Sequence, residues 1–356
     1  MPVVCSICDS KFSSKIKLVS HMLEHERQII FDDDITFIEV CAGAGGLSCG
    51  LIKAGFTPIL LNDNNADCCK TLELNHPGIT VSHCSMTDLK INGTVDLLCG
   101  GVPCQSFSQA GARKGLEDPR GNLMIEFSKL IDNVKPKVFM IENVKGLMTH
   151  DKGETLKIII ETLNNSKKYD IKYKLLNSLN FGVPQKRERV FIIGVLKSLN
   201  KEYKFPEPEK KIFSVGDALK NVPESPCAKY NEEKIELYKL IPQGGCWVNL
   251  PEHLQKSYLG NSYNSGGGKR GILHRLSMDK PSLTILCSPS QKQTERCHPL
   301  HNRPLSVRET ARIQTFEDSY EFVGSMSSQY KQVGNAVPVE LAARVGKSII
   351  DLLRSY

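Results

Sequence analysis

A thiol and a carboxyl group follow two apolar runs of the chain, and both groups can carry out chemistry. Cys104 comes shortly after the run Val95–Cys99, and Glu142 comes directly after Lys137–Ile141. Each run predicts a buried strand, and the carboxyl ends of parallel strands meet at one edge of an α/β sheet. A thiolate is a nucleophile, and a partly buried carboxyl group can donate a proton. Because the chain has thirteen cysteines, Cys104 taken alone is better explained as a packing residue.

The segment before Cys104 predicts the elements that start this sheet. Thr36–Val40 is typical of a strand, Cys41–Leu47 of a glycine turn, and the residues through Ala54 of a helix. A second strand over Pro58–Leu61 leads to Asp63, where an acidic residue is well placed to hydrogen-bond ribose hydroxyls. A third segment ends near Cys84-Ser85. The pattern favours a nucleoside-like ligand, with a tight turn that binds nothing as the alternative.

The N-terminal thirty residues have the ligand types and spacing of a tetrahedral zinc site, Cys5-x2-Cys8-x12-His21-x3-His25. With Phe12 and Leu18 as a small apolar core, the segment resembles a two-cysteine, two-histidine zinc finger, which implies a ββα fold and bound Zn²⁺. If it reads DNA, a helix from near Lys15 would present Ser14, Lys17 and Ser20 to bases. The alternative is an auxiliary clamp or a protein-contact module.

Length and composition limit the number of domains, the kind of partner and the cellular compartment that we expect. The 356 residues suffice for two domains, or for one large α/β domain with an insertion. The net charge of +7 gives mild support for a nucleic-acid partner. No apolar run reaches the roughly 18 residues of a membrane span, and no signal peptide is evident, so we expect an intracellular protein with no membrane partner. Its cysteines are then expected to be reduced.

Five motifs in order give the chain a specific resemblance. Phe37 to Gly46, Gly101 to Gly111, Glu142-Asn143-Val144, Gln185 to Arg189 and Gly334 to Pro338 are similar to the motifs of cytosine carbon-5 DNA methyltransferases of the bacterial restriction-modification type. The resemblance covers roughly Ile35 to the C-terminus. It implies a Rossmann-like S-adenosylmethionine-dependent methyltransferase sheet with a smaller target recognition domain.

The resemblance implies a role for each candidate catalytic residue. Cys104 would add as a thiolate to carbon 6 of a cytosine, because carbon 5 is otherwise too electron-poor to attack a methyl sulfonium. Glu142 would meet N3 and the exocyclic amine, while Arg189, Arg187 and Gln185 would orient the base and the loop. The target atom is unreachable inside a duplex, so the cytosine must be flipped out. The segment from Gln105 to Gly121 resembles a loop that closes over it.

The resemblance also implies a site for S-adenosylmethionine. Its predicted residues are Cys41, Gly43, Gly45, Gly46, Asp63, Asn64, Ser85, Pro103, Asn335 and Val337. Three of them depart from the common family pattern: Cys41 replaces an aromatic residue, Asn64 a large apolar residue and Ser85 an aspartate. These departures predict a weaker affinity for the cofactor, and they leave Cys104 and Glu142 untouched.

We predict four regions along the chain: a zinc finger and linker over 1–30, a catalytic and cofactor-binding domain over 31–196, a target recognition domain over 197–322, and a C-terminal return to the catalytic domain over 323–356. Lys269 and Arg270 could meet DNA in the recognition region, or could lie in a solvated glycine loop. Ser306 and Glu309 have the spacing of a capping box at the start of a helix. The chain should end in an amphipathic helix to Leu353.

Double-stranded DNA is the favoured partner, but two alternatives stay open. One branch of the family modifies tRNA and carries a Cys-Phe-Thr element, which this chain lacks. A catalytically silent DNA-binding protein would not need Cys104, Glu142 and Arg189 together. The resemblance also raises a cognate restriction endonuclease as a partner. We expect a monomer in the cytoplasm or nucleus of a host cell, and the recognition sequence is not readable from these residues.

Overall fold

The protein is described as a computed structural model, which covers residues 34–91, 93–103, 122–264, 271–289, 291–292 and 295–355, together with 3–4 and 11–12. It divides into two units, Met1–Ile35 and Thr36–Tyr356. In the first unit β1 (Val3–Val4) pairs antiparallel with β2 (Lys11–Phe12). The predicted zinc ligands and the predicted helix from Lys15 lie outside the described residues.

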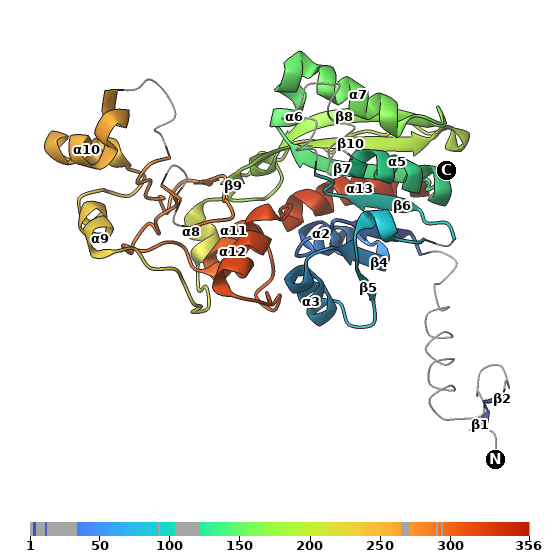
Figure 1. Ribbon diagram of the computed structural model, residues 1–356, viewed down its shortest axis with the longest axis horizontal. Helices are drawn as coiled ribbons and strands as arrows, with labels where there is room; N and C mark the ends of the chain where they lie inside the picture. Colours follow the sequence, from blue (N-terminus) through green and yellow to red (C-terminus); the bar gives the residue numbers. More distant parts are fainter. Residues whose placement is uncertain are drawn as a thin grey trace. The chain divides into compact units, whose positions relative to one another are not determined.

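The part of the second unit that the structure describes contains a seven-stranded sheet in the order β5-β4-β3-β6-β7-β10-β8 (Figure 1). Neighbouring strands from β5 to β7 run parallel, and β10 runs antiparallel to both β7 and β8. The strands are β3 (Thr36–Val40), β4 (Thr57–Asp63), β5 (Thr80–His83), β6 (Leu97–Gly100), β7 (Val138–Val144), β8 (Tyr169–Asn177) and β10 (Glu188–Leu196). The predicted α/β fold with a largely parallel sheet is confirmed.

Helices cover both faces of this sheet, because its strands alternate apolar side chains toward each side. The helices of this part are α2 (Gly46–Ala54), α3 (Ala66–Asn75), α5 (Asn122–Val134), α6 (Gly146–Thr149), α7 (Glu154–Leu163) and α13 (Val339–Arg354). Ile38 and Val40 of β3 belong to a core with Phe127 of α5 and Ile159 of α7. On the other face, Glu39 accepts a hydrogen bond from Ser48 of α2, and α2 in turn packs against α13.

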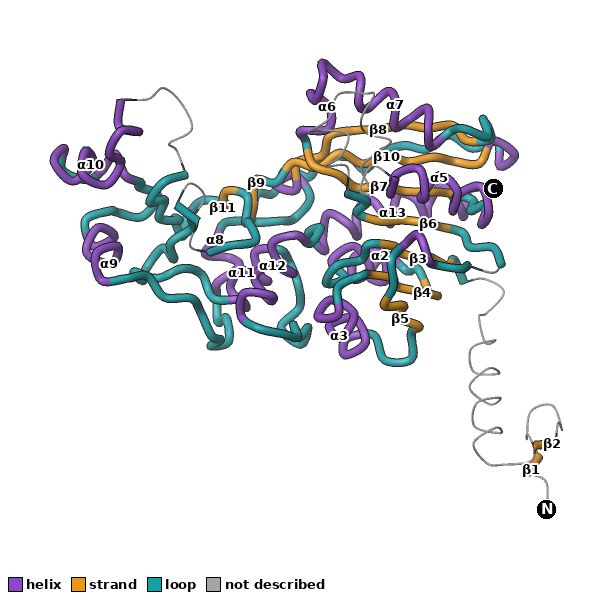
Figure 2. Tube along the Cα trace, viewed as in Figure 1, coloured by secondary structure: helices purple, strands orange, loops and turns teal. Residues whose placement is uncertain are grey.

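The chain between β10 and α13 forms a more irregular part, which lies beside the sheet in Figures 1 and 2. Its elements are α8 (Val215–Leu219), α9 (Glu232–Lys239), α10 (Glu252–Leu259), α11 (Val307–Ile313), α12 (Met326–Asn335) and β11 (Ser282–Leu283), which pairs in parallel with β9 (Gln185–Lys186). A small core around Tyr238 and Leu273 holds it, and Trp247 packs against that core. Lys269 and Arg270 lie outside the described residues.

Two predicted helix features are confirmed. Ser306 caps α11, where its side chain accepts from the backbone of Glu309 and the Glu309 carboxylate accepts from the backbone of Ser306. The C-terminal helix ends at Arg354, one residue beyond the predicted Leu353. The predicted boundaries of the catalytic and recognition regions stay predictions. No helix within the described ranges combines the length and apolar character needed to cross a membrane.

Candidate active site

The turn after β3 is the first part of the site, and its shape depends on glycine. Gly43 and Gly45 have φ values of +56° and +78°, in the left-handed region that favours glycine. Gly46 is required for a different reason, since a Cβ there would lie 2.3 Å from the carbonyl oxygen of Val337. Two predicted cofactor segments, the glycine turn and the residues before α13, are therefore in backbone contact.

Asp63, at the end of β4, holds this turn in place. One oxygen of its carboxylate accepts from the backbone N–H of Gly43 at 2.8 Å, and the other accepts from the backbone N–H of Asn65 at 2.8 Å. Beside it, the Asn62 amide donates to the carbonyl oxygens of Ser82 at 2.9 Å and Cys84 at 3.0 Å. The ends of β3, β4 and β5 are thus tied together. A carboxylate accepts up to about four hydrogen bonds, so Asp63 can still accept from a ligand.

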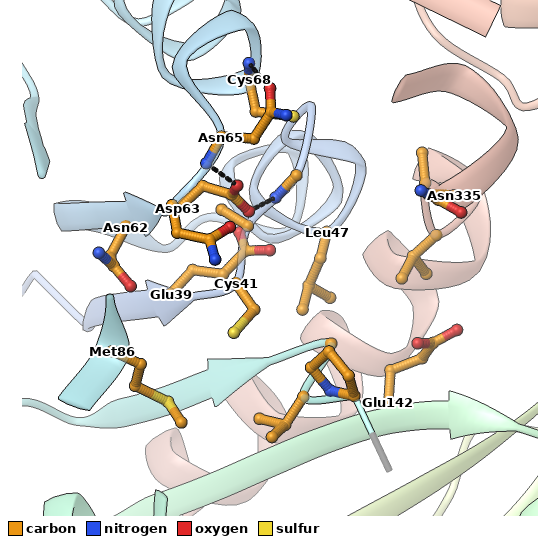
Figure 3. Close-up of a pocket in the computed structure, with 18 of the residues that line it drawn as sticks. Glu39, Cys41, Leu47, Asn62, Asp63, Asn65, Cys68, Met86, Glu142 and Asn335 are labelled. Carbon is orange, nitrogen blue, oxygen red and sulfur yellow. Dashed lines mark hydrogen bonds between the residues drawn. The ribbon is translucent and has the colours of Figure 1, made fainter. Parts of the chain in front are cut away.

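These strand ends surround a cavity of about 550 Å³ (Figure 3). The predicted residues that line it are Cys41, Gly43, Asp63, Asn64, Ser85, Pro103, Glu142, Asn335 and Val337. Gly45 and Gly46 shape the turn without lining the cavity, and Gln185, Arg187 and Arg189 also lie outside its lining. The cavity therefore brings together residues from both ends of the chain. Cys104 and the predicted closing loop fall outside the described residues, directly after Pro103.

Glu142, in β7, lines the cavity (Figure 3). Arg189 Nε lies 2.9 Å from Glu142 Oε1, and both side chains are largely buried. Burial raises the pKa of the Glu142 carboxyl, and the positive charges of Arg189 and Arg187 oppose this rise without cancelling it. A carboxyl group with a raised pKa can serve as a proton donor near neutral pH.

Arg187 and Gln185 have a different geometry from that of Arg189. The Arg187 guanidinium donates to the carbonyl oxygens of Ile285 and Gly334, both at 3.0 Å. The Gln185 side chain accepts from the Ile285 backbone N–H at 2.8 Å and donates to Gln314 at 2.8 Å. Both side chains are completely or almost completely buried. They join β9 to the segments around 285 and 334, so their contacts are with the protein framework.

Glu39 is a cavity residue that the sequence prediction missed. It is 1 % exposed, it lines the cavity, and it accepts a hydrogen bond from Ser48. Burial raises the pKa of Glu39 to about 8, and the nearby Asp63 and Glu142 carboxylates add to the rise. The available signal was a single acidic residue inside the buried run Thr36–Val40. Further cavity residues that the prediction missed are Leu47, Asn62, Asn65, Cys68, Met86 and Lys331.

The cavity thus offers hydrogen-bond acceptors at the Asp63 carboxylate and, at Glu142, a largely buried carboxyl group whose pKa is raised. Within the described ranges, no group of three or more His, Cys, Asp or Glu side chains is arranged to hold a metal ion.

Comparison with known proteins identifies the family. The model of the C-5 cytosine-specific DNA methylases matches residues 35–351. The chain belongs to this family. The family predicted from the five motifs is therefore confirmed, and the chain is a DNA cytosine-5 methyltransferase. The matched residues include all seven strands of the central sheet.

Three bacterial relatives are similar to this methylase over most of their length. It is 48 % identical to the type II methyltransferase M.PspPI of Psychrobacter sp. (strain TA137), over 90 % of this chain and 80 % of the relative. It is 46 % identical to the type II methyltransferase M.Eco47II of Escherichia coli, over 89 % of this chain and 79 % of the relative. It is 45 % identical to the type II methyltransferase M.Sau96I of Staphylococcus aureus, over 91 % of this chain and 77 % of the relative. All three relatives are named as type II methyltransferases, which supports the predicted resemblance to enzymes of the bacterial restriction-modification type.

Solved structures show the same fold. A structure described as a DNA modification methyltransferase encoded within an E. coli prophage has a TM-score of 0.68 and 24 % identity, over 90 % of this chain and all of that one. The Entamoeba histolytica methyltransferase EhMeth has a TM-score of 0.65 and 17 % identity, over 91 % of this chain and 100 % of that one. At these identities the likeness shows the fold of the methylase alone.

Proposed function

We propose that this methylase transfers a methyl group from S-adenosylmethionine to carbon 5 of one flipped-out cytosine in a specific sequence of double-stranded DNA. One observation carries the proposal. Glu142, paired with Arg189, lies in the wall of the same cavity as Asp63 and Gly43. Pro103, which precedes Cys104 in the sequence, lies in that wall too. The reaction needs a proton donor, a site for the methyl donor and a thiol. We assign the first two to Glu142 and to the cavity around Asp63, and the third to Cys104, which follows Pro103 in the sequence.

The cavity fits S-adenosylmethionine in chemistry and in size. When bound, S-adenosylmethionine supplies a methyl group on a positively charged sulfur. Asp63 keeps acceptor capacity for ribose hydroxyls, and Leu47, Met86 and Val102 offer apolar contact. The volume of about 550 Å³ is within the range of small-molecule sites. The proposed cofactor residues are those predicted from the sequence, with Gly45 and Gly46 acting through the shape of the turn.

The chain's own side chains would divide the work of activating the base. The Cys104 thiolate adds to carbon 6 of the cytosine, which makes carbon 5 nucleophilic. Glu142 delivers a proton at N3 as negative charge builds on the ring. Arg189 pairs with the Glu142 carboxyl, and Arg187 and Gln185 anchor the segment that leads into β10, the strand that carries Arg189. When carbon 5 takes the methyl group, S-adenosylhomocysteine is released. A base then removes the carbon-5 proton, the bond between Cys104 and carbon 6 breaks to regenerate the thiolate, and N3 returns its proton to Glu142.

The adenine side of the cavity is expected to bind more weakly than is usual for the family. Cys41 has a φ of +51° and lines the cavity where an aromatic ring is common. Burial raises the pKa of the Cys41 thiol to about 12, so this thiol stays neutral and gives a small apolar contact. Asn64 and Ser85 also line the cavity.

The N-terminal unit is proposed to be a zinc finger that contacts DNA. Cys5 and Cys8 fall in the chain between β1 and β2, whose antiparallel pairing is the arrangement of a ββα finger. These two thiolates and the imidazoles of His21 and His25 form a tetrahedral donor set that suits Zn²⁺. The region 197–322 is proposed to recognise the target sequence. We also propose that the enzyme is a monomer inside the cell and that a cognate restriction endonuclease acts on the same DNA site.

A transfer assay tests this function. Duplex DNA of mixed sequence and S-adenosylmethionine labelled in the methyl group should give labelled 5-methylcytosine with the wild-type enzyme. Cys104→Ala should abolish the transfer while leaving the melting temperature unchanged. Label that enters tRNA and not duplex DNA would reject the DNA substrate.

A further inference from the structure

Lys331 stands out among the residues that line the active-site cavity, because it differs from the others in charge. The acidic lining residues are Glu39, Asp63 and Glu142, and among the described lining residues Lys331 is the one cation. Burial raises the pKa of Glu39 and of Glu142, so these carboxyl groups offer an anion no positive partner whether they are protonated or not, and a negatively charged ligand group is attracted to Lys331. The cavity therefore has one region that suits an anion.

The neighbours of Lys331 on α12 are already bonded to the protein. Ser328, Gln332 and Asn335 lie on the same face of the helix, since residues three and four apart are adjacent. Ser328 Oγ donates to Asp67 at 2.6 Å. The side-chain oxygen Oε1 of Gln332 accepts from the Thr71 hydroxyl at 2.7 Å, and Asn335 Oδ1 accepts from the Cys287 thiol at 2.8 Å. These contacts fix the helix face that carries Lys331.

The Lys331 ammonium has no such bond. Within the part of the chain that the structure describes, no hydrogen bond or ion pair engages it, although α12 is held on either side of it. One helical turn further on, the Asn335 side-chain amide keeps its N–H groups, because its contact with Cys287 uses the oxygen. An ammonium and an amide one turn apart can donate to the two oxygens of one carboxylate.

We propose that Lys331 binds the α-carboxylate of the amino-acid end of the methyl donor, with the Asn335 amide as second donor. This inference rests on the proposed use of S-adenosylmethionine and adds the group that reads its amino-acid end. The ribose then lies toward Asp63, and the α-carboxylate lies at Lys331. A competing role for Lys331 is contact with a DNA phosphate, which requires no carboxylate on the small ligand.

Two ligands separate these roles in the DNA-free, full-length enzyme. S-adenosylhomocysteine carries the amino-acid end, and 5′-methylthioadenosine has the same adenosine and sulfur without it. Calorimetry should show that Lys331→Gln weakens binding of S-adenosylhomocysteine about tenfold, as expected for loss of a charge-assisted hydrogen bond. Binding of methylthioadenosine should not change. Lys331→Arg should keep most of the affinity for S-adenosylhomocysteine, because it keeps the charge.

Lys347→Gln is the matched control. This exposed lysine on α13 pairs with Asp351 at 2.9 Å and does not line the cavity, so both ligands should bind this variant as they bind wild type. Unchanged affinity of Lys331→Gln for S-adenosylhomocysteine would overturn the inference and leave the contact with a DNA phosphate as the role of Lys331. A wild-type enzyme that binds neither ligand would instead reject the proposed methyl donor.

Discussion

Arg189 and Glu142 face each other diagonally across two antiparallel strands. In the register of β7 and β10, Glu142 is opposite Phe191, and Arg189 is opposite Val144. Arg189 and Phe191 are two residues apart, so the side chains of Arg189 and Glu142 lie on the same face of the sheet. The resulting ion pair of 2.9 Å places a positive charge beside a largely buried carboxyl group in the cavity wall.

Arg189→Gln should therefore damage catalysis more than stability. We expect kcat to fall about a hundredfold, in the range for a mispositioned acid. Removing the positive charge should also raise the pKa of Glu142 further, so activity that needs protonated Glu142 should persist to higher pH than in wild type. The measurement is kcat against pH. Lys145→Gln, which breaks the exposed ion pair with Glu188, is the control and should leave the profile unchanged.

Glu39 should make folding stability depend on pH. Its pKa is about 8 in the folded protein, against an ordinary value of 4.5, so the folded state binds the proton more tightly than the unfolded state. The stabilisation is fully present below pH 4.5 and is lost as pH rises through 8. From pH 4.5 to 7 the loss is about 3 kcal/mol.

Urea unfolding of wild type and Glu39→Gln at several pH values measures this effect. The difference in unfolding free energy between the two proteins should shift in favour of the variant as pH rises, because an amide has no proton to lose. A difference that stays constant from pH 5 to pH 8 would mean that Glu39 is ionised in the fold.

Gly46→Ala should destabilise the cofactor end of the fold. The added methyl group would lie 2.3 Å from the Val337 carbonyl oxygen, and that backbone must move. We expect a loss of about 2 kcal/mol, as for other overpacking substitutions, and a lower affinity for S-adenosylhomocysteine. Gly146→Ala is the control, because nothing lies within 4 Å of its Cβ. Equal melting temperatures for the two variants would contradict the close contact.

The N-terminal unit should hold one zinc ion per chain. Cys5→Ser should lose the metal, because a hydroxyl is a poor zinc ligand. Elemental analysis of the purified full-length protein measures zinc content, and Cys227→Ser, outside the predicted ligand set, should retain it. A Cys5→Ser protein with full zinc content would mean that the ligands have been wrongly assigned.

The strands that carry the site could largely be predicted from the sequence. Thr36–Val40 was placed to the residue, because a short apolar run next to a glycine turn is a strong local signal. The strand end at Asp63 and the position of Glu142 followed from the same pattern. The observed strands β4 and β7 extend beyond the predicted ends, so that Asp63 and Glu142 lie within them.

Other features depend on contacts between distant segments, and no local pattern reveals them. Strand β8 (Tyr169–Asn177) is half polar because it lies at the sheet edge, and it was not predicted. The framework role of Arg187 depends on carbonyl groups about 100 and 150 residues away in sequence. The cation at Lys331 reaches the cavity only because α12 returns to the strands formed at the start of the chain.

The central claim is that Cys104 attacks the target cytosine, and a covalent trap tests it most directly. The substrate is a duplex that contains 5-fluorocytosine at the methylated position, offered with S-adenosylmethionine. Fluorine cannot leave as a proton does, so the enzyme should stay bonded to the DNA, and mass spectrometry of the digested adduct should place the bond at Cys104. An enzyme that methylates ordinary DNA but forms no adduct, or forms one at another residue, would contradict this account.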